Sequence, residues 1–186
     1  MSVQPLFVSV LHTQLVRGTL VAMVAAFIVY MTSQPAIAST ESSQFIATAV
    51  AKLLLLAPGS DTLLEALGLP LTVSELAPAL DHVIRKTAHF TEYAALGFVL
   101  AAWLQHTRLF HARAYWLAAI AGVIFAVSDE WHQTFVPGRS GELSDVLLDS
   151  LGSLVGVLLY YAVKTLWGLR RQNRERPVLK KAAWGL

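Results

Sequence analysis

Four stretches of the sequence are long and apolar enough to cross a lipid bilayer as helices. A span of the hydrocarbon layer takes roughly 20 mostly apolar helical residues at about 1.5 Å each. We place the spans at about residues 15–32, 86–104, 114–132 and 144–167. Backbone polar groups inside a bilayer must be paired within the chain. The sequence therefore predicts an all-α membrane bundle of about four transmembrane helices.

The composition excludes several functional classes. Of the 186 residues 55% are hydrophobic and only 14% are charged, whereas about a quarter are charged in a soluble domain. The chain has no cysteine, which excludes disulfides, thiol catalysis and thiolate metal sites. The net charge of +2 reflects a basic tail, residues 169–186, beyond the last span. A cytoplasmic anchor over anionic membrane lipid explains this tail better than a nucleic-acid partner does.

Lysine and arginine near the span ends predict the orientation. Arg108 and Arg113 flank the connection between the second and third spans, and the basic tail follows the fourth. These segments belong in the cytoplasm. With an even number of spans, the N-terminal flank 1–14 is cytoplasmic too. We therefore expect a multi-pass protein of the cytoplasmic membrane with both termini inside. Arg85, Lys86 and Arg139 would then be basic residues on the outer side, which suggests that they have a task.

The segment between the first two spans reads as helix rather than as a further span. Residues 39–57 carry apolar side chains at helical spacing, which predicts an extracytoplasmic helix lying in the membrane interface. Pro58-Gly59-Ser60 would end it, and Asp61 would cap a short helix that Gly68 and Pro70 stop. Thr72 and Glu75 have the spacing of a capping box for the next helix.

The first span has a competing interpretation. Arg17, the apolar run that follows it and Ala36-Ile37-Ala38 resemble the three parts of a cleavable signal peptide. Cleavage would leave the orientation of the other spans unchanged.

Polar residues gather where three spans reach the outer side. Such residues are expensive inside a bilayer and are functional candidates. The second span opens with Arg85, Lys86, His89, Glu92 and Tyr93; the third ends with Asp129, Glu130, His132 and Gln133; Arg139 follows in a turn, and Asp145 and Asp149 begin the fourth. We expect Asp129, His132 and Gln133 to share one face of the third helix, with Glu130 pointing away. Gly152 and Gly156 extend the stripe of Asp145 and Asp149 and favour close helix packing.

These residue types suggest roles for a site. His89 or His132 would be the acid–base group, oriented by Glu92 or Asp129. Arg85, Lys86 and Arg139 would hold phosphate, and Asp145 and Asp149 would bind a cation or position water. Tyr93, Glu130 and Gln133 complete the expected substrate-binding set. Asp129, Glu130 and His132 are also metal-ligand types, but no HExxH motif is present, so a divalent cation stays an open alternative.

Three ordered motifs carry a resemblance to a known family. They are Arg85-Lys86-x-x-His89-Phe90-x-Glu92-Tyr93, Ser128-Asp129-Glu130-x-His132-Gln133-x-Phe135-Val136-Pro137-Gly138-Arg139 and Asp145-Val146-x-x-Asp149-x-x-Gly152. With Thr32-Ser33-Gln34-Pro35, they make residues 28–165 resemble the VanZ-like family of bacterial membrane proteins, named for a teicoplanin-resistance protein. The resemblance implies a retained first span and a membrane domain over 15–168. The long segment 39–80 departs from the family pattern.

Two functions follow as hypotheses. The first is action at the outer leaflet on the cell envelope, binding or processing a lipid-linked, phosphate-bearing anion such as a cell-wall precursor, with the glycopeptide-resistance role that the resemblance implies. The second is a non-catalytic envelope or partner-docking protein whose polar cluster clamps the fold. A proton or ion carrier fits least, because the cytoplasmic halves of the spans are nearly free of ionisable groups.

Overall fold

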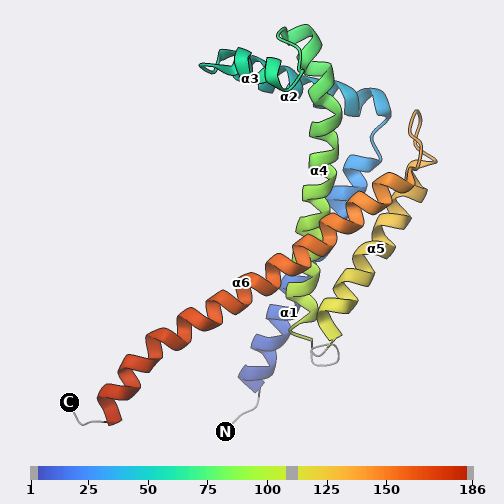
Figure 1. Ribbon diagram of the computed structural model, residues 1–186. Helices are drawn as coiled ribbons and strands as arrows, with labels where there is room; N and C mark the ends of the chain where they lie inside the picture. The colour runs from blue at the N-terminus through green and yellow to red at the C-terminus, as the bar shows by residue number, and fades with distance from the viewer. Residues whose placement is uncertain (1–3, 108–112, 184–186) are drawn as a thin grey trace.

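The computed structural model describes residues 4–107 and 113–183, with side chains from 13 to 107 and from 113 to 171. Six α-helices and no strand occupy these ranges (Figure 1). The helices are α1 (Gln4–Thr32), α2 (Ala36–Leu56), α3 (Ser60–Ala66), α4 (Val73–Leu104), α5 (Ala114–Gln133) and α6 (Leu143–Ala183). The predicted all-α class is confirmed. Arg108 and the side chains of the basic tail beyond Arg171 lie outside the described residues.

Three helices are long and apolar enough to cross a membrane, at Thr13–Thr32, Ala114–Gln133 and Leu143–Arg171. A fourth candidate is the pair α2 and α3, which is bent by 112°. With three to four such helices, the chain is a multi-pass membrane protein. Residues 86–104 of α4, our predicted second span, do not pass the same test, because Lys86, His89 and Glu92 lower their hydropathy. Since α4 packs against α1, α5 and α6, it does not need an apolar surface on every side.

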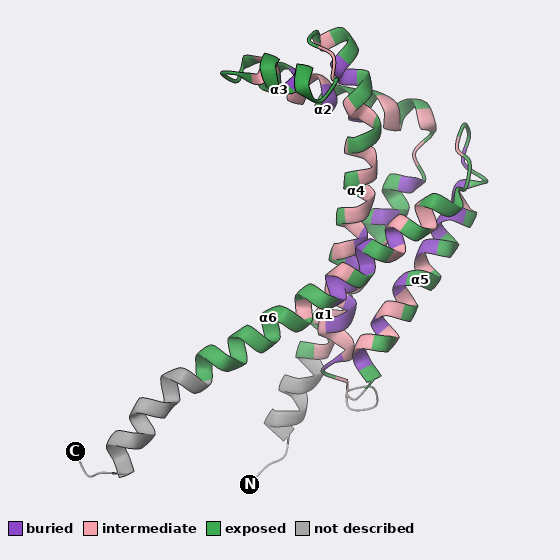
Figure 2. Ribbon diagram, viewed as in Figure 1, coloured by how far each residue is buried: buried purple, intermediate pink, exposed green. Residues whose placement is uncertain are grey.

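The bundle core lies around α4. Its residues are Tyr93, Leu96, Leu100 and Ala101 of α4, Ile28 of α1, Ala118 and Ala126 of α5 and Val157 of α6. In contrast, the large apolar side chains of α5, among them Trp116, Ile120 and Trp131, are exposed (Figure 2). Small residues inside and large apolar residues outside are typical of helices packed in lipid. Ile28 also packs the first apolar helix into the core.

Helices α4 and α6 cross at very close range. A Cβ added at Gly152 would lie 2.5 Å from the Phe90 carbonyl oxygen, and one added at Gly156 would collide with the Ala94 carbonyl. On α4, Gly97 faces the Ser153 backbone in the same way. Glycine removes the side chains that would hold the backbones apart, so the predicted contact role of Gly152 and Gly156 is confirmed.

Helices α2, α3 and residues 73–84 of α4 form a second packed unit, which we call the platform. Its core consists of Ala47, Ala51, Leu64, Leu76 and Ala77. In Figure 1, α2 runs across the end of α4 rather than along it. The platform leaves Phe45, Leu53, Leu56, Leu63 and Leu67 exposed. This apolar surface fits the predicted place in a membrane interface.

The helix starts in the platform differ in detail from our expectations. Helix α4 begins directly after Thr72, as the capping-box spacing predicts, but the Thr72 hydroxyl donates to Glu75 Oε2 at 3.1 Å and accepts no hydrogen bond from a backbone amide of the helix. The N-cap of α3 is Gly59, in the left-handed region with φ of 76°, so our assignment of that position to Asp61 was wrong. Asp61 instead lies in the first turn, where its charge favours the helix dipole.

Candidate functional site at one end of the bundle

The polar residues converge at one end of the bundle, which we call the polar end. It comprises the end of α1, the stretch of α4 from Arg85 to Tyr93, the end of α5, the loop 134–142 and the start of α6. Antiparallel packing brings these segments together: at the opposite end, Gly18 of α1 lies against Trp103 of α4. Here, the Ala36 amide donates to the Pro137 carbonyl at 3.3 Å, which joins the loops after α1 and α5.

Asp129 is held by two donors from other helices. Oδ1 accepts a hydrogen bond from the Thr32 hydroxyl at 2.7 Å, and Oδ2 accepts one from the Tyr93 hydroxyl at 3.2 Å. All three residues are buried. The carboxylate therefore joins α1, α4 and α5 at a single point, and each of its oxygens retains a further lone pair.

Asp149 and His89 form the second part of the site. Asp149 is fully buried on α6, and Nδ1 of His89 lies 3.8 Å from its Oδ2. At that distance the two groups are an ion pair when the imidazole is protonated, but they are too far apart for a hydrogen bond. Neither Asp149 oxygen accepts a hydrogen bond from any residue whose side chain the structure describes. A buried carboxylate without a donor is costly and requires an explanation.

Glu130 belongs to the same interior, contrary to our expectation that it points away. Its Oε1 accepts from Gln133 Nε2 at 2.6 Å and its Oε2 accepts from the Glu142 backbone amide at 3.0 Å. The inward face of α5 runs through Gly122, Ala126, Asp129, Glu130 and Gln133. The loop 134–142 covers Glu130 through the Glu142 amide, which periodicity within α5 alone does not reveal.

Arg139 connects the loop 134–142 to the end of α1. Its Nε donates to the Gln34 carbonyl at 2.9 Å, its Nη2 to the Met31 carbonyl at 3.4 Å, and its Nη1 to Gln133 Oε1 at 3.0 Å. A cation at the last carbonyls of a helix is favourable. Three of the five guanidinium N–H groups are thus used in the fold.

The remaining predicted residues are placed differently. Lys86 forms an ion pair with Asp145, which links α4 to α6 away from the carboxylates of α5. Glu92 is half-buried one turn below His89. His132 is also half-buried, and its Nδ1 has no hydrogen-bond partner among the residues described. The geometry thus brings together five residues: His89, Tyr93, Asp129, Glu130 and Asp149. His132 takes part in none of the contacts described above.

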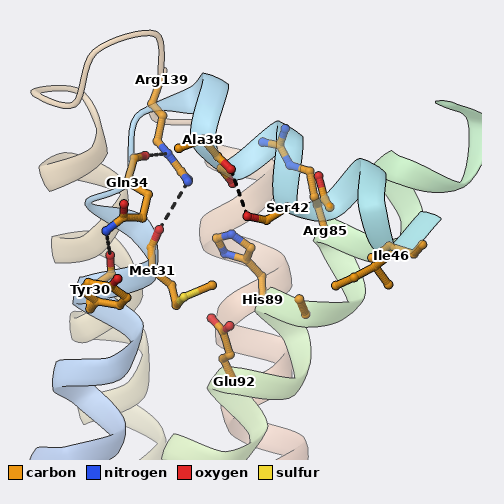
Figure 3. A pocket seen from close by; sticks show the side chains of 14 residues that line it. Tyr30, Met31, Gln34, Ala38, Ser42, Ile46, Arg85, His89, Glu92 and Arg139 are labelled. Carbon is orange, nitrogen blue, oxygen red and sulfur yellow. Dashed lines mark hydrogen bonds between the residues drawn. The ribbon is translucent and has the colours of Figure 1, made fainter. Parts of the chain in front are cut away.

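A pocket of about 260 Å³ opens beside this cluster, between α1, α2 and α4. Arg85 and Arg139 lie above His89 and Glu92 on its wall (Figure 3). Burial and the neighbouring positive charge of Arg85 lower the pKa of Arg139 from its usual value, although a guanidinium remains charged. No described residue accepts a hydrogen bond from Arg85 or forms a salt bridge with it. Two like charges share one pocket, and neither forms a salt bridge with a described residue.

A second hollow of about 350 Å³ runs between α1 and α4. It is lined by Met23, Val24, Phe27, Thr91 and Ala95, together with Glu92. Glu92 also lines the first pocket, so the polar pocket and the apolar groove adjoin at this residue. The first pocket therefore combines charged and apolar side chains, whereas the groove beside it is almost wholly apolar.

Sequence reasoning missed four residues that contribute to the site. Thr32 was noted only as part of a motif, yet it is a buried donor to Asp129. Ser39, Ser42 and Ser43 of α2 line the pocket, although the segment seemed to be interfacial only. The signal for Thr32 was present, because a threonine at the polar end of an apolar span needs a partner. No sequence signal indicated that α2 would fold back over the pocket.

Three carboxylates are arranged as a metal site would be. Asp129, Glu130 and Asp149 each offer an oxygen, and these oxygens lie within 4.8 Å of one another. The expected set of Asp129, Glu130 and His132 is thus replaced by one in which Asp149 takes the place of the histidine.

Comparison with known proteins gives one match. The family described as VanZ/LLP1 matches residues 18–165, which is more than half of the chain and includes α1 from Gly18 and the polar end. No curated protein and no solved structure matches the sequence.

Proposed function

Because this chain belongs to the VanZ/LLP1 family, we propose that it is a membrane protein of the cell envelope that binds a phosphate-bearing lipid at the outer leaflet. The phosphate would lie in the polar pocket, between Arg85 and the two N–H groups of Arg139 that the fold leaves free. One acyl chain would lie in the groove between α1 and α4.

The observation that carries the proposal is the unpaired guanidinium of Arg85. It faces the same pocket as Arg139, and their mutual repulsion is one reason that the pKa of Arg139 is lowered. An anion between them would remove that repulsion and satisfy both forks. Phosphate suits arginine because its oxygens accept two parallel hydrogen bonds.

The pocket supports binding more directly than it supports turnover. For catalysis, His89 is the acid–base group that we propose, because it lines the pocket while its Nδ1 lies close to the buried carboxylate of Asp149. Glu92 would contact the bound head group from below. Product analysis after incubation with the purified lipid tests whether the protein breaks a bond of this lipid.

A matched pair of lipids tests the proposal. Purified protein in detergent is titrated with dioctanoyl phosphatidic acid and with dioctanoylglycerol, which has the same chains and no phosphate. We expect saturable binding of the first only, and a loss of about 10- to 100-fold in Arg85→Gln, the effect of one charge-assisted hydrogen bond. Arg113→Gln, an exposed arginine that precedes α5, should bind as the wild type does. Equal binding of both lipids would refute the phosphate site.

The groove is tested by filling it. Ala95 is exposed and lines the groove, so Ala95→Phe should weaken binding of the lipid while leaving inorganic phosphate unaffected. Ala26→Phe, an exposed position on α1 that lines neither hollow, is the control. Equal lipid affinity in both variants would place the acyl chain elsewhere.

We extend the proposal to glycopeptide susceptibility, the phenotype for which the VanZ-like family is named. Cells that express the wild type should tolerate more teicoplanin than cells that express Arg85→Gln at the same abundance in the membrane. Equal tolerance would separate lipid binding from resistance.

The non-catalytic alternative is favoured by the Lys86–Asp145 ion pair and by the three hydrogen bonds of Arg139. We assign these residues to the framework that shapes the pocket. If Arg85→Gln and His89→Ala also lost membrane abundance in proportion to their phenotype, the whole cluster would be a clamp.

A further inference from the structure

We propose that Asp129, Glu130 and Asp149 form a binding site for a hard divalent cation in the core of the bundle, behind the pocket. This inference does not depend on the proposed lipid binding, since it rests on other residues. None of the three carboxylates lines the polar pocket.

The negative charge of the three carboxylates is not balanced by the residues around them. Three buried carboxylates have oxygens within 4.8 Å of one another. Lys86 pairs with Asp145. Arg139, although Asp129 and Glu130 attract it, donates its hydrogen bonds to two carbonyls and to Gln133. Among the described residues, His89 is the imidazole within ion-pair range, 3.8 Å from Asp149. One imidazolium and one guanidinium do not balance three negative charges in a medium of low dielectric constant.

The surroundings of Asp149 support a cation independently of this charge balance. Its side chain is 0% exposed, and neither of its oxygens has a hydrogen-bond donor among the described residues. By contrast, Asp129 is supported by Thr32 and Tyr93. Glu130 has Gln133 and the Glu142 amide. Donors of this kind orient ligand carboxylates in metal sites and leave a lone pair for the metal. Asp149 has no such donor among the described residues. Its carboxylate lies in the cluster, and the lone pairs of both oxygens are available to a cation.

The donor set determines the class of cation. Carboxylate oxygens without thiolate are the ligands of Ca²⁺, Mg²⁺ and Mn²⁺. These cations hold their oxygen ligands at about 2.0 to 2.6 Å. Three oxygens within 4.8 Å of one another are close enough to share one such ion. Since two ligands come from α5 and one from α6, the ion would fasten these helices together.

Thermal melting of the full-length protein tests the site. Protein stripped with EDTA is melted without metal and with Ca²⁺, Mg²⁺ or Mn²⁺, with choline chloride at equal ionic strength as the control. A ligand that binds only the folded state raises Tm. We expect a rise of about 5 °C or more at a cation concentration roughly 100 times Kd. Mn²⁺ titration followed by electron paramagnetic resonance should give one bound ion per chain.

The variants locate the ion. Asp149→Asn should abolish the Tm rise and the bound Mn²⁺, yet melt in EDTA at or above the wild-type temperature, because it removes an uncompensated buried charge. Asp61→Asn, at an exposed carboxylate of α3, should respond to metal as the wild type does. If Asp149→Asn fails to accumulate, Glu130→Gln is used, with loss of the bound Mn²⁺ as the readout. A wild type with no metal response, or an unchanged response in these variants, overturns the site.

Discussion

At the residue scale, Arg85 and Arg139 line the same pocket but are held in different ways. Arg139 is fixed by two backbone carbonyls and by Gln133, whereas no described residue accepts a hydrogen bond from Arg85. An arginine bound to the end of a helix is part of the fold, and one that faces an open pocket is available to a ligand. We therefore regard Arg139 as the residue that positions the pocket wall and offers its two remaining N–H groups to the anion, and Arg85 as the one whose whole guanidinium is available to it.

This difference gives a prediction for stability. Arg139→Gln removes three hydrogen bonds and leaves the Gln34 carbonyl without its arginine donor, whereas the Met31 carbonyl keeps the Gln34 amide. We expect a loss of about 2 kcal/mol or more in the free energy of unfolding, and a clear fall in Tm. Arg85→Gln should melt within about 0.5 kcal/mol of the wild type. Detergent melting curves of the two variants measure this directly, and similar losses in both would contradict the distinction.

The sequence was a better guide to which residues come together than to which pairs of residues contact each other. His89, Asp129 and Asp149 come together because alternating spans return their ends to one side, which spacing and topology reveal. The carboxylate that orients the histidine was expected to be Glu92 or Asp129, but the one in ion-pair range of His89 is Asp149 of α6. Helix periodicity ranks neighbours within one helix, whereas rotation between helices depends on packing that periodicity does not contain.

At the element scale, the crossing of α4 and α6 determines the geometry of the site. Gly152 and Gly156 on α6 and Gly97 on α4 let the two backbones touch. Asp149 lies one turn before Ser153 on α6, and His89 lies two turns before Gly97 on α4. The same close crossing therefore sets the distance between the imidazole and the carboxylate.

A pair of glycine substitutions in α6 tests this role. In Gly156→Ala the new methyl group would collide with the Ala94 carbonyl, so the helices must separate and the protein should lose membrane abundance and Tm. In Gly168→Ala nothing lies within 4 Å of the new methyl group. That variant should be as stable as the wild type or slightly more so, because alanine favours helix. Equal abundance of the two variants would show that the close crossing is not required.

Prediction of the elements succeeded where apolar runs were uninterrupted. The first, third and fourth spans lie within α1, α5 and α6. The second was placed at 86–104, yet α4 starts thirteen residues earlier, at Val73, and supports the platform. The polar first turns of the span seemed to mark its boundary with water. Instead, these polar turns belong to the site, and the helix continues beyond them to its start at Val73.

At the scale of the whole molecule, the loops after α1 and α5 lie at one end, joined by the hydrogen bond from Ala36 to Pro137. The basic flank at Arg113 and the tail after Arg171 belong to the other end, which predicts that both termini are cytoplasmic. Reporter fusions after Gln34 and Ser140 should read outside, and those after Thr107 and Arg171 inside. A cytoplasmic signal at Ser140 would place the pocket on the wrong side for an outer-leaflet lipid.

At this scale, we propose that the polar end holds a phosphate-bearing lipid through Arg85. Native mass spectrometry of the protein, purified gently from its own membrane, measures this lipid. We predict about one phosphate-bearing lipid per chain in the wild type and in Arg113→Gln, and its loss in Arg85→Gln at unchanged folding. If all three proteins instead carried the same mixture of lipids, in the proportions of the surrounding membrane, the claim would be contradicted.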